Sequence, residues 1–105
     1  MLEGKYSLRY IPRYEADLIE FVDYLVFKLH NLDAAKKLID KIENAITERL
    51  NCPLSFEPFH SNRKRKNPYY RIYVDNFTVY YVVIDDVMEV RRVLYKGRDA
   101  GKLIK

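Results

Sequence analysis

The most concentrated chemistry in this sequence lies in one short stretch, where an unbroken basic run follows a histidine. His60 precedes Arg63, Lys64, Arg65 and Lys66. A histidine exchanges a proton near neutral pH and can serve as a general acid or base, while arginine and lysine bind phosphate oxygens. We therefore read the run either as a contact for a polyanion or an acidic partner, or as a solvated charged loop.

Positive charge also gathers towards the C-terminus. The whole chain has a formal net charge of +4 and a pI near 9.1. A basic surface of this kind attracts nucleic acid, an acidic protein or an anionic membrane surface. The C-terminal basic residues are Arg91, Arg92, Lys96, Arg98, Lys102 and Lys105.

Length and composition predict a single globular domain, residues 1–105. Apolar residues make up 49% of the chain and charged residues 32%, a balance typical of globular rather than disordered proteins. No apolar run approaches the roughly 20 residues that span a bilayer, and no signal-peptide core follows Met1. We expect a cytoplasmic protein that makes no membrane contact.

Cysteine chemistry is limited by number. Cys52 is the only cysteine, so an internal disulfide and a cysteine metal site cannot form. We expect Cys52 to be buried and structural, because free cysteines usually are. We expect neither a metal nor a cofactor.

A strand and two helices are predicted in the first half of the chain. Alternating aromatic and polar residues over 5–11 predict a strand, which ends at Pro12, where a helix can begin. Apolar residues then recur at helical spacing up to a break at 30–32. Asp33 is expected to cap a second helix, and Pro53 to stop it.

Both helices are amphipathic, so their apolar stripes predict an antiparallel hairpin packed on a common layer. The first helix also begins with acidic residues, which the positive end of a helix dipole favours. These residues are Glu15, Asp17, Glu20 and Asp23.

The last third of the chain predicts three strands, at 70–74, 77–84 and 87–95. The continuous apolar run Val79–Ile84 is typical of a central strand that is buried on both faces. The order β-α-α-β-β-β predicts an α+β domain, with a twisted and mainly antiparallel sheet packed on the helical hairpin. The long stretch 51–69 is predicted to be a functional or mobile loop.

The arrangement of these segments resembles the RelE/ParE toxins. Residues 70–83 read YRIYVDNFTVYYVV and residues 93–99 read VLYKGRD. The family pattern is roughly YRxxxVxNYxVxYxVxxxxxxVxRVLYGRRD. In the first helix, Ala16, Asp17, Leu18 and Tyr24 match its acidic-apolar start, and the similarity extends over about residues 5–104.

The resemblance implies the toxin of a bacterial type II toxin–antitoxin, or plasmid stabilisation, system. Its partner would be a cognate acidic antitoxin, through which alone it would reach operator DNA. RelE-like members cut mRNA on the ribosome, whereas ParE-like members poison DNA gyrase. Our first hypothesis is a metal-independent mRNA endonuclease. The alternatives are a non-enzymatic gyrase inhibitor and a non-toxic, antitoxin-bound co-repressor.

For RNA cleavage, the resemblance implies a role for residues in the last third of the chain. Arg98 matches a family arginine that would grip a phosphate, and Arg71 falls near another basic position. Tyr73 and Tyr95 could stack a base, with Lys96 and the cations at positions 63–66 on the phosphates.

Two departures weaken this interpretation. Thr78 stands where the RelE-like pattern has an arginine, and a late family tyrosine falls near Leu103 or Ile104. An RNase mechanism would need His60, Lys64 or Lys66 to supply the missing groups.

Overall fold

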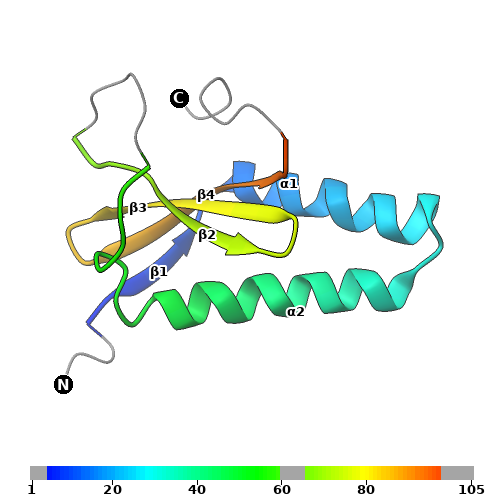
Figure 1. Cartoon of the computed structure of the whole chain (residues 1–105), viewed down its shortest axis with the longest axis horizontal. Helices are drawn as coiled ribbons and strands as arrows, with labels where there is room; N and C mark the ends of the chain where they lie inside the picture. The colour runs from blue at the N-terminus through cyan, green and yellow to red at the C-terminus, as the bar shows by residue number, and fades with distance from the viewer. Residues whose placement is uncertain (1–4, 60–65, 98–105) are drawn as a thin grey trace.

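Two helical segments lie against one face of a four-stranded sheet in the computed structural model, which describes residues 5–59 and 66–97 (Figure 1). The predicted α+β order β-α-α-β-β-β is confirmed. In chain order the elements are β1 (Ser7–Tyr10), α1 (Pro12–Asp23), the π-helix η1 (Tyr24–Lys28), α2 (Leu32–Arg49), β2 (Tyr70–Val74), β3 (Phe77–Ile84) and β4 (Val87–Tyr95).

The strands are arranged in the order β1-β4-β3-β2, and only the β1–β4 pair is parallel. In the β3–β4 pair, Tyr80 lies opposite Arg92 and Tyr81 lies opposite Val90, so Arg91 is an extra residue that forms a bulge. β3 is an inner strand, and its residues from Val79 to Val82 are all buried, which confirms the predicted central strand.

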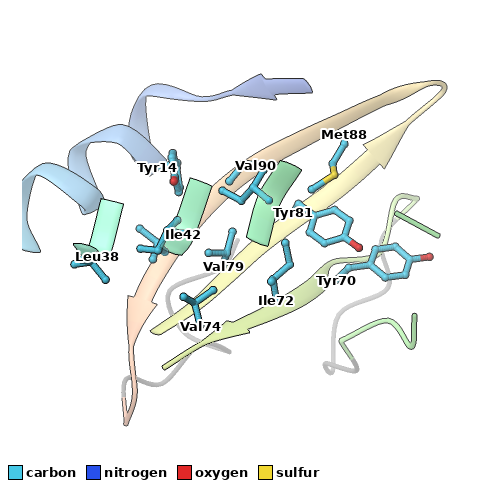
Figure 2. Close-up of a cluster of buried hydrophobic side chains, with 12 residues drawn as sticks. Tyr14, Leu38, Ile42, Tyr70, Ile72, Val74, Val79, Tyr81, Met88 and Val90 are labelled. Atoms are coloured by element: carbon cyan, nitrogen blue, oxygen red, sulfur yellow. The ribbon is translucent and has the colours of Figure 1, made fainter. Parts of the chain in front are cut away.

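The core lies between the helical hairpin and the sheet. Ile42 and Ile46 of α2 are completely buried, and they belong to one cluster with Val79 and Tyr81 of β3 and Val90 of β4. Figure 2 shows Ile42 lying with Val79 and Val90 in this layer. The apolar stripe of α2 therefore packs as the sequence predicts, whereas the stripe of the first helix packs only in part, since Leu29 is exposed.

The ends of the helices differ in part from the prediction. Pro12 occupies the first turn of α1, as expected, but the second helix is capped by Asn31 rather than Asp33. The Asn31 side chain accepts a hydrogen bond from the Ala34 amide at 3.0 Å. His30 has a φ of 52° and reverses the chain just before the cap, which fixes where α2 starts.

Two further details concern α2 and the segment after it. The helix ends at Arg49, before Pro53, and Cys52 between them is exposed. The expectation that Cys52 is buried was therefore wrong, because the chain leaves the helix towards solvent at this point.

Among the described residues, no helix is long and apolar enough to cross a membrane.

Replacing Tyr14 with phenylalanine should leave the free energy of unfolding unchanged or raise it by up to about 1 kcal/mol. The Tyr14 hydroxyl is buried, and within the described residues it has no hydrogen-bond partner. Burial, then the nearby Tyr10 and Glu43, raises the pKa of Tyr14 above the ordinary tyrosine value of about 10. Urea unfolding at pH 7 tests the expected change in stability.

Because the pKa of Tyr14 is raised, the free energy of unfolding depends on pH. Above about pH 10 the unfolded chain releases the Tyr14 proton while the folded chain retains it, so the stability that this group contributes falls as pH rises towards its folded pKa. The advantage of Tyr14→Phe should therefore grow between pH 9 and pH 11. A variant that is less stable than the parent by more than about 1 kcal/mol would show that the hydroxyl has a partner.

Candidate functional surfaces

Arg71 and Tyr73 lie together on the outer face of the sheet, the face turned away from the helices. Tyr70, Ile72 and Val74 of the same strand pack into the helix-facing core, and alternate residues of a strand point to opposite faces. The Arg71 guanidinium lies 5.6 Å from the ring centre of Tyr73, which is 68% exposed. The structure therefore brings these two predicted site residues together.

A third side chain completes this cluster. Phe59, from the segment before β2, places its ring centre 4.9 Å from the Arg71 guanidinium. A guanidinium between two aromatic rings is held by cation–π attraction, each contact being worth about 0.5–1 kcal/mol when exposed. Arg71, Tyr73 and Phe59 are named the outer-face cluster below.

Arg49, the last residue of α2, holds the following segment against the edge of the sheet. Its Nη1 donates hydrogen bonds of 3.0 Å to the Arg71 carbonyl and to the Tyr81 hydroxyl. The Tyr81 hydroxyl donates to the Pro53 carbonyl at 2.7 Å, and the Arg49 guanidinium lies 3.5 Å from the Phe56 ring centre. Burial raises the pKa of Tyr81, although the Arg49 hydrogen bond acts in the opposite direction.

Part of the outer face is covered by its own aromatic and aliphatic side chains. Tyr80, Val82 and Leu94 are buried there with Tyr69, and the Phe59 ring packs edge-on against Tyr80 at 5.7 Å. Burial raises the pKa of the Tyr80 hydroxyl. Tyr80 is therefore a packing residue, and the exposed aromatic surface on this face centres on Tyr73.

Tyr95 lies on the opposite face from Tyr73. Its ring centre is 5.3 Å from that of Phe77 and 6.5 Å from that of Phe21 in α1, so it faces the helices. Lys96 is exposed just after β4, and its backbone amide donates to the Asn76 carbonyl. Tyr73 and Tyr95, both predicted to stack a base, therefore lie on opposite faces of the sheet.

Two arginines that the sequence placed on a basic surface are instead held in ion pairs. Arg92 is 7% exposed, and its Nε and Nη2 donate to the two carboxylate oxygens of Asp17 at 2.7 and 3.1 Å. Arg91 donates from Nε to Glu89 at 2.6 Å. The expected C-terminal basic surface is therefore smaller than the residue types suggest.

Glu89 of the inner strand β4 connects this strand to the edge strand β1. It accepts hydrogen bonds from Arg9 of β1 at 2.8 and 2.6 Å as well as from Arg91. Burial alone would raise the pKa of Glu89, but the two guanidiniums hold it below the usual value. The pairs cancel charge locally, which further limits the free positive charge near β1 and β4.

The helical hairpin extends beyond the end of the sheet (Figure 1). A groove of about 810 Å³ is lined by residues from this end of the hairpin and of the sheet. Residues of α1 and η1 line one side, residues of α2 line the other, and the β2–β3 turn and the end of β4 close the base. It is named the hairpin groove below. Its apolar lining includes Phe21, Tyr24, Leu25, Leu29, Leu38 and Phe77.

Comparison with known protein families finds a match over most of this chain. Residues 8–100 match the family model described as "ParE toxin of type II toxin-antitoxin system, parDE". The chain belongs to the ParE toxin family. No curated protein sequence matches it.

Solved structures share the fold of this ParE-family toxin at low sequence identity. The chromosomal ParDE system from P. aeruginosa is 16% identical, with a TM-score of 0.65 over 88% of this chain and 97% of that one. The isolated E. coli RelE toxin is 18% identical, with a TM-score of 0.58 over 90% and 87%. The E. coli DinJ–YafQ toxin–antitoxin complex is 15% identical, with a TM-score of 0.54 over 96% and 99%.

Only some of the residues predicted for catalysis or for RNA binding in this ParE-family toxin lie within the described part of the structure. Arg71 and Tyr73 meet in the outer-face cluster, whereas Tyr95 and Lys96 lie at the end of β4 near the hairpin groove. Lys66 is exposed. His60, Arg63, Lys64, Arg65 and Arg98 lie outside the described residues, as do Leu103 and Ile104.

Sequence reasoning missed the role of Asp17 in this ParE-family toxin. Asp17 is 7% exposed and joins α1 to β4 by accepting hydrogen bonds from Arg92 and from the Val93 amide at 3.1 Å. It was interpreted as one of several acidic residues near a helix start. Its position in the sequence could have revealed this role, because Asp17 falls on the same helix face as Tyr14 and Phe21. A charge on the face of a helix that packs against the core needs a buried partner.

Proposed function

We propose that this ParE-family toxin, neutralised in the cytoplasm by a cognate acidic antitoxin, arrests growth by binding DNA gyrase and does not act as an enzyme. The observation that carries the proposal is a pair of large apolar side chains exposed on the first half of the hairpin. Ile19 of α1 is 58% exposed and Phe27 of η1 is 71% exposed.

These two side chains are suited to a protein partner. Ile19 and Phe27 are about two helical turns apart on the α1–η1 segment, with the exposed Asp23 between them. Exposed aromatic and aliphatic side chains are typical of protein interfaces, where aromatic residues provide much of the binding energy. A gyrase subunit offers such a partner, whereas the phosphate backbone of RNA does not.

The positions of the RNA-directed candidates give further support. Arg71 and Tyr73 occupy the outer face, whereas Tyr95 occupies the helix-facing side, so these three side chains do not share one face of the sheet. Arg92 is held by Asp17, and Arg91 by Glu89. A nuclease needs a base, an acid and cations within hydrogen-bond reach of one reacting phosphate.

Metal-independent mRNA cleavage on the ribosome is the second candidate, and the outer-face cluster is the observation that favours it. Arg71 between Phe59 and Tyr73 offers a cation and an exposed ring to a phosphate and a base. In this case Arg98 would contribute a second guanidinium, and His60 or the cations at 63–66 would supply proton transfer or phosphate contacts.

The antitoxin is part of either proposal. The chain's structural neighbours include the E. coli RelBE and DinJ–YafQ toxin–antitoxin complexes. A cognate antitoxin would hold this toxin inactive and would provide any contact with operator DNA. A third possibility, a non-toxic co-repressor, predicts normal growth after strong induction of the toxin alone.

Antitoxin-free toxin should block DNA supercoiling by purified gyrase, and Phe27→Asp should weaken the block at least about 10-fold, since a charge in an interface core removes a large share of its binding energy. Leu54→Asp is the matched control: Leu54 is 52% exposed but lies in the segment after α2, so this variant should block supercoiling like the parent. Arg71→Ala should also retain the block.

The same proteins are then added to programmed ribosomes. The gyrase proposal expects intact mRNA with every variant. Discrete cleavage that Arg71→Ala or Arg98→Ala abolishes and Phe27→Asp leaves unchanged would replace it with the endonuclease candidate. Supercoiling that is unaffected by the parent toxin would also exclude gyrase as the target.

A further inference from the structure

We infer that the antitoxin-free toxin associates with a second copy of itself, each copy covering the hairpin groove of the other about a twofold axis parallel to the groove. The inference concerns self-association and stands apart from the choice between gyrase and mRNA. Its basis is an uncovered apolar groove whose two sides carry opposite, unpaired charges.

The groove is uncovered because the helical hairpin extends past the β2–β3 turn, where none of the described strands lies beneath it (Figure 1). The groove lining at this end of the hairpin is mainly apolar. Tyr24, Leu29 and Tyr95 at this end are 54%, 51% and 47% exposed.

Apolar side chains exposed to this extent favour association. Burying an aromatic or leucine side chain that is half exposed removes apolar surface from water, at about 25 cal/mol per Å². Because the half-exposed side chains stand at the rim of the groove, they can enter the groove of a second copy in return. Such an interface is isologous: the same residues are used twice.

The charges decide which occupant fits. Glu20 lines the α1 side and Lys37 lines the α2 side, and within the described residues neither has an ion-pair partner. Lys41 at the same rim is already paired with Asp75 at 2.9 Å. The groove therefore offers one free acid and one free base, on opposite sides.

A second copy satisfies both charges at once. A twofold axis parallel to the groove places the α1 side of each copy opposite the α2 side of the other, so Glu20 of one copy faces Lys37 of its partner, and the reverse. A wholly acidic segment would pair with Lys37 but would meet Glu20 as a like charge. Opposite-charge pairs across an interface set its register and its choice of partner.

The test uses charge-swapped full-length chains in sedimentation equilibrium at low ionic strength. The parent toxin is expected to be dimeric, and Glu20→Lys and Lys37→Glu should each weaken dimerisation at least about 10-fold, because each places like charges at both contacts. An equimolar mixture of the two variants should restore the dimer, since both contacts in the mixed pair are then between opposite charges. Lys36→Glu and Glu48→Lys, exposed charge changes outside the groove lining, should associate like the parent.

Three outcomes would overturn the inference. The first is a toxin that stays monomeric at every concentration up to about 100 µM. If hydrogen exchange at the amides of Tyr24 and Leu29 then slows only when antitoxin is added, the groove is assigned to the antitoxin. The second is a dimer that both variants leave unchanged. The third is a mixture that dimerises no better than either variant alone. Thermal unfolding of each variant separates these results from a loss of fold.

Discussion

Replacing Asp17 with leucine is expected to lower the free energy of unfolding by about 3–5 kcal/mol. The carboxylate accepts hydrogen bonds from Arg92 and from the Val93 amide, and all three groups are buried. Without it, the Arg92 guanidinium keeps its charge in the interior and loses its carboxylate partner. Since domains of this size are stable by about 5–15 kcal/mol in total, urea unfolding should show a large shift of the midpoint.

A matched ion pair on the surface is the control. Asp75→Asn breaks the Lys41–Asp75 pair, whose side chains are more than half exposed, and should cost no more than about 1 kcal/mol. The double variant Asp17→Leu/Arg92→Met should be more stable than Asp17→Leu alone, because it removes the buried charge as well as its partner. Equal losses for Asp17→Leu and Asp75→Asn would show that the buried pair does not join α1 to β4.

Replacing Arg49 with alanine is expected to lower the free energy of unfolding by about 2–3 kcal/mol. Hydrogen bonds from a charged donor contribute about 1.5–3 kcal/mol, and the contact with the Phe56 ring adds about 0.5–1 kcal/mol. The guanidinium is only partly buried, which reduces the sum. The variant also loses the link between α2 and the Arg71 carbonyl, so the amides of Ser55 and Phe59 should exchange hydrogen faster.

Arg49→Lys distinguishes charge from geometry. An ammonium keeps the positive charge but cannot lie flat against Phe56 while donating to two acceptors, so about half of the loss is expected. A lysine variant that matches the parent in stability and in the exchange of these amides would show that charge alone is sufficient at this position.

Most of the fold was predictable because it depends on local patterns. Alternation predicted β1, helical spacing predicted the hairpin, and the apolar run in β3 predicted an inner strand. The cap was misplaced by two residues because Asn31 and Asp33 are both good caps, and the turn at His30 decides between them. Such a choice depends on backbone geometry that residue types do not reveal.

The candidate sites were less predictable because they depend on contacts between distant segments. Arg71 and Tyr73 are two residues apart in one strand, so their shared face followed from strand periodicity. The face that Tyr95 occupies could not be predicted in this way, because the bulge at Arg91 shifts the alternation along β4 and places Tyr95 on the helix-facing side. Asp17 and Arg92 are 75 residues apart, and no local pattern indicates that they pair.

The parallel pairing of β1 with β4 has a consequence for how the toxin is made. Ser7 lies beside Val87, so β1 has no strand partner until β4, which comes much later in the chain, has been synthesised. The pair between α1 and β4 is delayed in the same way. Translation that stops before β4 leaves β1 and α1 without their partners, so the fold, and with it the potency of the toxin, is acquired only after β4 has been made.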